Sequence, residues 1–140
     1  MPAYVLLHLL PDEEQVACLN SGEDKDLEHA LIEATLHGRC AAALARGLYR
    51  PVAIVEAADL GDLFQRSNHI ETDWTGNPGV RLVVGRQRST SVGDIALSAA
   101  TREAWSCATF GWTLVDAAET RARIVAAAEP LLRNASQPAH

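Results

Sequence analysis

The chain has 140 residues, of which 48% are hydrophobic and 21% charged, the proportions of one ordinary globular domain with its own core. A formal net charge of −6 argues against broad nucleic-acid binding, which needs a basic surface to neutralise phosphates. The wide spacing of the three cysteines, Cys18, Cys40 and Cys107, fits buried, reduced thiols rather than a disulfide framework or a metal site.

The chain begins with a short apolar run, AYVLLHLL, over residues 3–10. A continuous apolar run of this length predicts a strand that is buried on both of its faces. His8 interrupts the run and Pro11 stops it, so it is too short to span a membrane, and it lacks the basic start of a signal peptide. We therefore expect a cytoplasmic protein without membrane contact.

Residues 11–23 are polar and rich in turn formers, and a helix is expected to follow. Asp24 is a good N-cap, the acidic residues after it suit the positive end of a helix, and apolar residues then return at helical spacing. This pattern predicts one long helix over residues 24–45 that stops near Gly47, with Gly38 as the point where it bends or splits.

The middle of the chain reads mainly as strands. A β-rich segment covers residues 49–57, and Asp59 then caps a short helix that runs through Phe64. Further strands are expected over residues 80–85 and 93–98, and residues 104–115 continue as one or two more.

An alanine-rich helix follows Asp116, Pro130 bends or ends it, and the last six to eight residues are expected to fray. The sequence thus predicts a single α/β or α+β domain over residues 1–140, with a mixed sheet of about four to six strands. The domain contains the long helix of the N-terminal half, the short middle helix and the C-terminal helix. Because a small alanine-rich helix packs readily against a copy of itself, a homodimer is compatible with the sequence.

Turn formers, a tryptophan and three arginines gather in the segment NHIETDWTGNPGVRLVVGRQRSTSVGDI, from Asn68 to Ile95. Its glycines, proline and Asp73 are explained by turns, but Trp74 and the arginines are not. Trp74 either folds back as a lid on the core or stands exposed as an anchor for a partner. Arg88 either forms an internal salt bridge with Asp94, or it stays free with Arg86 as a receptor for an anion.

Several chemistries lack their usual signatures in this sequence. The histidines show no metal-ligand spacing, and neither a GxGxxG nor a GxxxxGKS loop is present, so we expect no metal and no cofactor. A small hydrolase or other enzyme remains an alternative, although the GxSxG turn of many serine hydrolases is absent. Its polar cluster would be His69, Asp73, Ser89, Ser91 and Asp94.

The pattern RSTSVGDI followed by FGWTLV resembles the YodL-like domains of small proteins carried by plasmids, phages and integrative elements. The likeness covers roughly residues 49–115, about half of the chain. Where that pattern often has serine, this chain has Gly93. The resemblance implies an accessory factor of a mobile element without an established reaction. The positions that match the pattern are Arg88, Ser89, Ser91, Val92, Gly93, Asp94, Gly111 and Trp112.

Our leading hypothesis from the sequence is a non-enzymatic accessory protein of a mobile genetic element that binds a protein partner or a small ligand. Because loops carry function, we place its surface in the loop region of residues 68–94. The candidate binding residues are Asn68, His69, Asp73, Trp74, Arg86, Arg88, Ser89, Ser91 and Asp94. A third hypothesis, suggested by the net charge and by GEDKDLE, is an acidic interaction protein or DNA mimic that blocks a basic partner.

Overall fold

The computed structural model describes residues 1–68, 73–85 and 87–135 and forms one α+β domain. Six strands make a single sheet in the order β3-β2-β1-β4-β5-β6, and every pair of neighbours is antiparallel. The elements in chain order are β1 (Ala3–Leu9), α1 (Glu13–Ser21), α2 (Lys25–His37), α3 (Ala41–Ala45), β2 (Tyr49–Glu56), α4 (Leu60–Arg66), the 3-10 turn η1 (Trp74–Gly76), β3 (Val80–Arg81), β4 (Ile95–Ser98), β5 (Ala104–Cys107), β6 (Trp112–Leu114) and α5 (Ala118–Ala135). The fold class predicted from the sequence is confirmed, with a sheet that is antiparallel rather than mixed.

The first strand, β1, lies in the interior of the sheet between β2 and β4, as its continuous apolar run predicts. Val5 and Leu7 point into a core beneath α2, α3 and α5, whereas Tyr4 and Leu6 point into a second core on the opposite face. Alternate residues of one strand therefore serve two separate cores, which is why none of them is polar except His8.

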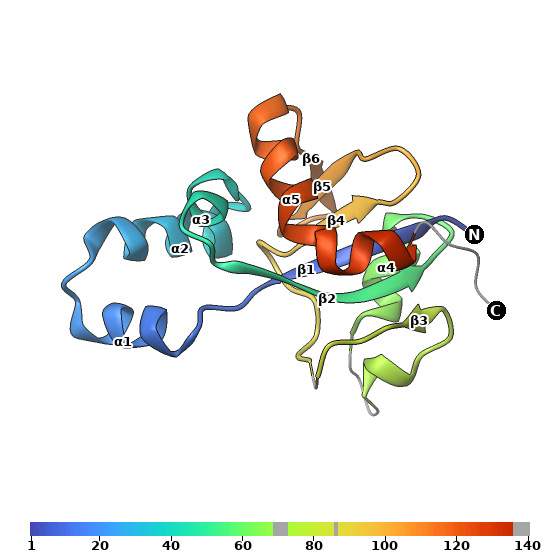
Figure 1. Cartoon of the computed structure of the whole chain (residues 1–140), viewed down its shortest axis with the longest axis horizontal. Helices are drawn as coiled ribbons and strands as arrows, with labels where there is room; N and C mark the ends of the chain where they lie inside the picture. Colours follow the sequence, from blue (N-terminus) through green and yellow to red (C-terminus); the bar gives the residue numbers. More distant parts are fainter. Residues whose placement is uncertain (69–72, 86, 136–140) are drawn as a thin grey trace.

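The helices cover the two faces of the sheet unequally. On one face of the sheet α5 packs against β1, β2 and β4. The helices α2 and α3 lie at the end of the same face and, together with α1, form an arm that projects from the sheet (Figure 1). On the other face the short helix α4 contributes Leu63, and the turn η1 contributes Trp74. This second layer leaves β5 and β6 partly uncovered: Trp105 and Trp112 are only half-buried there.

The helices include one that the sequence prediction missed, and they decide between alternatives that it left open at Gly38 and Pro130. Residues 13–21, expected to be part of a polar connection, form α1, because Asp12 and Gln15 complete a capping box around its first turn. The long helix is split into α2 and α3 at Gly38, whose φ of 66° ends α2 in a left-handed cap.

Pro130 lies inside α5 and does not end that helix, which continues to Ala135. The predicted strand over residues 80–85 shrinks to two residues, Val80 and Arg81, while residues 104–115 form two strands joined by a tight hairpin. Of the tail expected to fray, residues 136–140 lie outside the described residues. None of the helices within the described ranges has the length and apolar character needed to cross a membrane.

Candidate functional site

The segment between β3 and β4 crosses the end of β1 and is fixed there by Trp74. The side chain of Trp74 is fully buried, and its indole Nε1 donates a 2.7 Å hydrogen bond to the carbonyl oxygen of Arg88. Its ring lies against that of His8, with the ring centroids 6.0 Å apart. Trp74 is therefore a lid on the core, which confirms one of the two interpretations of its role and excludes the exposed anchor.

An ion pair between a partly exposed arginine and a buried carboxylate closes the same segment on itself. Asp94 is fully buried and accepts two hydrogen bonds from the Arg88 guanidinium, 2.7 Å from Nη1 to Oδ2 and 2.8 Å from Nη2 to Oδ1. The backbone N–H groups of Leu9 and Ser91 complete the set of donors, at 2.9 and 2.8 Å. The hydrogen bonds to Asp94 raise the pKa of Arg88 above its ordinary value. Arg88 and Asp94 thus form the internal salt bridge, and the free-receptor interpretation is wrong for Arg88.

His8 is the member of this buried network that the sequence analysis did not select. Its Nε2 lies 3.1 Å from the Thr90 hydroxyl and 3.7 Å from Asp94 Oδ2, and its Nδ1 has no hydrogen-bond partner among the described residues. Burial lowers the pKa of His8 to about 4, so its ring is neutral at physiological pH. The signal in the sequence was a lone histidine within an otherwise apolar strand.

Hydroxyl, histidine and carboxylate meet here, but they do not form a catalytic triad. A triad needs the hydroxyl and the carboxylate on different ring nitrogens, so that one orients the base that the other uses. In this protein Thr90 and Asp94 both face Nε2 of His8. All three side chains are also buried, with at most 2% of the residue exposed, so a substrate has no approach to them. The network holds the fold together.

The backbone at Gly93 leaves no room for a side chain. Its φ is +96°, and a Cβ at this position would lie 2.6 Å from the carbonyl oxygen of Ala34. Its own carbonyl accepts a 2.5 Å hydrogen bond from the Tyr49 hydroxyl, and burial raises the pKa of that tyrosine above its ordinary value. Only glycine combines this conformation with the close approach of α2.

The remaining candidate residues are placed individually. The side-chain amide of Asn68 donates to the carbonyl of Phe64, and Asp73 accepts from the backbone N–H of Thr75 at 3.0 Å and begins η1. Ser91 is exposed, and its hydroxyl lies 3.3 Å from Nη1 of Arg88; the carbonyl of Ser89 accepts from the same nitrogen at 2.8 Å. His69 and Arg86 lie outside the described residues. Within the described ranges, no three His, Cys, Asp or Glu side chains gather so as to hold a metal ion.

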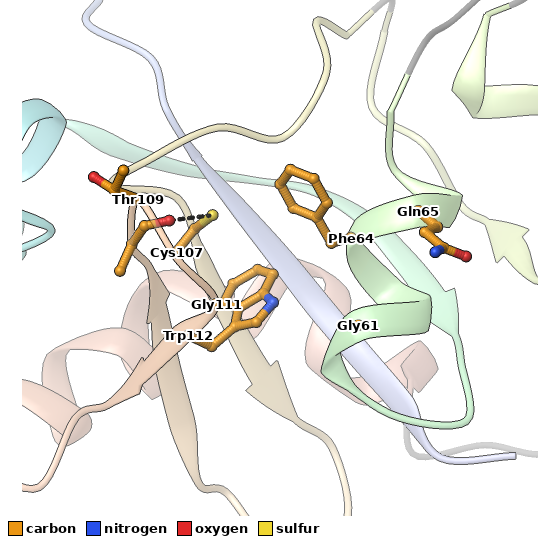
Figure 2. A pocket seen from close by; sticks show the side chains of 8 residues that line it. Gly61, Phe64, Gln65, Cys107, Thr109, Gly111 and Trp112 are labelled. Carbon is orange, nitrogen blue, oxygen red and sulfur yellow. Dashed lines mark hydrogen bonds between the residues drawn. The ribbon is translucent and has the colours of Figure 1, made fainter.

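An apolar hollow of about 240 Å³ opens on the face of the sheet that α4 leaves partly uncovered (Figure 2). Its lining residues, all uncharged, come from α4 and from the β5–β6 hairpin, and they are Gly61, Phe64, Gln65, Cys107, Ala108, Thr109, Gly111 and Trp112. Trp112 forms one side and donates from Nε1 to the carbonyl of Leu60 at 3.1 Å. Burial raises the pKa of the Cys107 thiol to about 11, so that thiol is not a ready nucleophile.

Within the described part of the chain, β5 is the one neighbour of β6 in the strand order, so β6 forms an open edge of the sheet beside the hollow. Exposed apolar side chains lie on the hairpin at this edge, where Phe110 is 94% and Leu114 48% exposed, and across the hollow on α4, where Phe64 is 39% exposed. The sequence from Ala104 to Val115 contains no charged residue. We call Phe64, Phe110, Trp112, Thr113 and Leu114 the β6 edge. Among these residues only Trp112 is a matched position of the motif in the sequence, because the others become neighbours through the fold.

The fold and these two features define a small antiparallel α+β protein with a buried polar network at one end of β1 and an apolar, uncharged sheet edge. Comparisons of the chain with protein-family models, with curated proteins and with solved structures each give no match. The resemblance to YodL-like domains therefore stays a prediction from the motif residues.

Proposed function

We propose that this protein is a non-enzymatic binding protein that recognises a protein partner through the β6 edge. The observation that carries the proposal is the open edge strand itself, which presents unpaired backbone groups and exposed apolar side chains next to an apolar hollow. A partner's extended segment can add a strand to such an edge while its side chains enter the neighbouring pocket.

The two edges of the sheet differ in how they are protected. Natural proteins protect edge strands against pairing with charged residues, prolines or bulges. At the other edge of this sheet, β3 carries Arg81, whose Nε lies 3.2 Å from Glu56 Oε1, and Pro78 precedes it. The strand β6 is also short, which itself limits pairing, but its three residues, Trp112, Thr113 and Leu114, include no charge and no proline. An uncharged edge beside exposed aromatic residues such as Phe110 has the composition of a protein-binding surface.

The polar network supports this proposal by accounting for residues that could otherwise suggest catalysis. Arg88, Asp94 and Trp74 were candidate binding residues, and all three use their polar groups within the chain. We propose that they hold the segment before β4 in place, and that binding occurs at the β6 edge. A role as an accessory factor of a mobile element belongs to the same proposal through the motif resemblance alone.

Site-specific photo-crosslinking in the native host tests this proposal. A p-benzoylphenylalanine in place of Phe110 puts the crosslinker on the β6 edge, and one in place of Val16 puts it on α1 in the arm, where the side chain is 41% exposed. We expect a defined protein, identified by mass spectrometry, to be captured from position 110 and not from position 16. Capture from neither position, or equally from both, would refute the proposal.

A further inference from the structure

The hydrogen-bonding pattern of the β5–β6 hairpin identifies which backbone groups of the edge are open. The N–H of Val115 donates to the carbonyl of Ala104 at 2.8 Å, so these two residues form a hydrogen-bonded pair. Hydrogen-bonded pairs alternate in an antiparallel ladder, and the register pairs Ser106 with Thr113 two residues further on. The N–H and C=O groups of Thr113 therefore face β5, and those of Trp112 and Leu114 face outward.

A second observation supports this assignment independently. The N–H of Cys107 donates at 2.7 Å to the carbonyl of Asp94, and its carbonyl accepts from Gly93 at 2.8 Å. Both polar groups of Cys107 are thus directed toward β4 and away from Trp112, its partner in the register. Trp112 has no backbone partner on β5, as the alternation requires.

The open groups of β6 are complementary to themselves. If a second copy pairs antiparallel about a two-fold axis through Thr113, Trp112 of each copy lies opposite Leu114 of the other. Each such pair exchanges two N–H···O=C bonds, so all the outward backbone groups of Trp112 and Leu114 are satisfied at once. The two side chains project on the same face as the hollow, since they are two residues apart in a strand. An interface of this kind is isologous, as in most homodimers.

The charge of the protein limits where a second copy can meet this one. Each chain carries a formal charge of −6, so two copies repel one another over most of their surface. The run from Ala104 to Val115 carries no charge and is where that repulsion is weakest. A basic partner would instead be drawn to the acidic surface and would gain nothing from an uncharged edge.

The other surface that the sequence suggested for dimerisation is already occupied. The small and apolar face of α5, which includes Ile124, Ala128 and Leu131, packs on the chain's own sheet. On its outer face α5 carries ion pairs such as Arg133 with Glu129, 2.9 Å apart. A self-association through α5 would therefore bury charged groups, which the β6 edge does not require.

Taken with the proposed function, on which this inference rests, the geometry points to a homodimer in which two β6 strands pair across a two-fold axis into one continuous sheet. Phe110 and Leu114 supply the apolar contacts, and the partner copy covers the hollow beside Trp112. The protein partner recognised by the β6 edge is then a second copy of this chain.

Sedimentation equilibrium of the purified chain, from low micromolar to near-millimolar concentration, tests the homodimer. We expect a reversible monomer–dimer equilibrium that Leu114→Lys weakens about thirtyfold or more, the effect of losing one interface hot spot. Ala122→Lys is the matched control, because it adds the same charge on an exposed residue of α5 and should leave the equilibrium unchanged. Phe110→Ser, at a residue 94% exposed, provides a second variant that does not disturb the fold.

Amide hydrogen exchange locates the interface within the same samples. The amides of Trp112 and Leu114 should become protected as the dimer forms and stay unprotected in Leu114→Lys. A dimer that is insensitive to both edge variants would overturn the β6 pairing, and so would a monomer at every concentration. In either case, capture of a different protein from position 110 would leave the proposed function standing, whereas capture of nothing would refute both.

Discussion

Replacing Arg88 with alanine tests how much its ion pair with the buried Asp94 contributes to stability. The change removes both guanidinium donors and leaves the fully buried carboxylate of Asp94 with the backbone N–H groups of Leu9 and Ser91. Breaking a buried pair in this way costs about 3–5 kcal/mol. Because the Arg88 side chain is 39% exposed, solvent screens part of the interaction, and we expect the lower end, about 3 kcal/mol.

A loss of this size is large against the total stability of a small domain, about 5–15 kcal/mol. It should lower the midpoint of urea unfolding by about 2 M if the denaturant slope is near 1.5 kcal/mol per molar. Fluorescence is a suitable probe because the indole of Trp74 is fully buried and bonded to the Arg88 carbonyl. Arg88→Lys keeps the charge but loses the paired geometry, and it should fall between wild type and Arg88→Ala.

Arg123→Ala is the control for this measurement. Arg123 pairs with Glu119 at 3.4 Å on the surface of α5, where both side chains are largely exposed. Such a pair is worth less than about 0.5 kcal/mol, so the unfolding midpoint should hardly move. If Arg88→Ala shifted the midpoint as little as Arg123→Ala, the carboxylate of Asp94 would be satisfied by backbone donors alone and our account of the ion pair would be wrong.

Three further predictions concern other buried groups. Burial lowers the pKa of His8 to about 4, so as the pH falls this histidine takes up a proton in the unfolded chain before it does so in the folded one. The free energy of unfolding should therefore fall by up to about 3 kcal/mol between pH 6.5 and 4. Urea unfolding measured across this pH range should show a flatter profile for His8→Gln than for wild type. Gly93→Ala would bring its Cβ against the Ala34 carbonyl at a φ of +96° and should cost about 3 kcal/mol, or about 10 °C in Tm by calorimetry. The thiols of Cys40 and Cys107, whose pKa values burial raises to about 11, should resist iodoacetamide at pH 8 in the folded protein, as measured by mass spectrometry.

Each of these three predictions has a control within the same chain. Gly47 also has a positive φ, of +67°, but nothing lies within 4 Å of a Cβ there, so Gly47→Ala should cost only about 1 kcal/mol. Equal losses at Gly47 and Gly93 would show that the contact with Ala34 is unimportant. Cys18 is half-buried and should be alkylated before the other two thiols. A pH profile of His8→Gln that matched wild type would show that another group causes the acid sensitivity.

Local patterns in the sequence were sufficient to predict the structure at positions where the residue type allows few conformations or environments. The apolar run of residues 3–10 required a strand with both faces covered, and Gly38 supplied the left-handed cap that divides α2 from α3. The internal salt bridge was also accessible, because Arg88 and Asp94 are six residues apart and bracket one turn. For Trp74 the sequence left two interpretations open, a lid on the core or an exposed anchor, and the structure shows the lid.

Contacts between distant residues could not be predicted in the same way. His8 and Thr90 are 82 residues apart, and only the pairing of β1 with β4 brings them together. Phe64 and Trp112 meet at the hollow because α4 lies over the end of the sheet, which no spacing in the sequence encodes. The helix α1 was missed because its apolar face is weak and none of its residues is buried, so only its capping box marked it.

The two halves of the motif resemblance, RSTSVGD and FGW, are physically coupled in this fold. Gly93 and Asp94 each exchange a backbone hydrogen bond with Cys107, at 2.8 and 2.7 Å, just before the hairpin that carries Phe110 and Trp112. The ion pair with Arg88 holds Asp94 from the other side, so the buried network fixes the start of β4 and through it the base of the hairpin. A rigid base lowers the conformational entropy that an edge loses on pairing. Under the proposed function, the polar residues of the segment that looked most like a site act at a distance, because they position an apolar edge that no motif in the sequence marks as a binding surface.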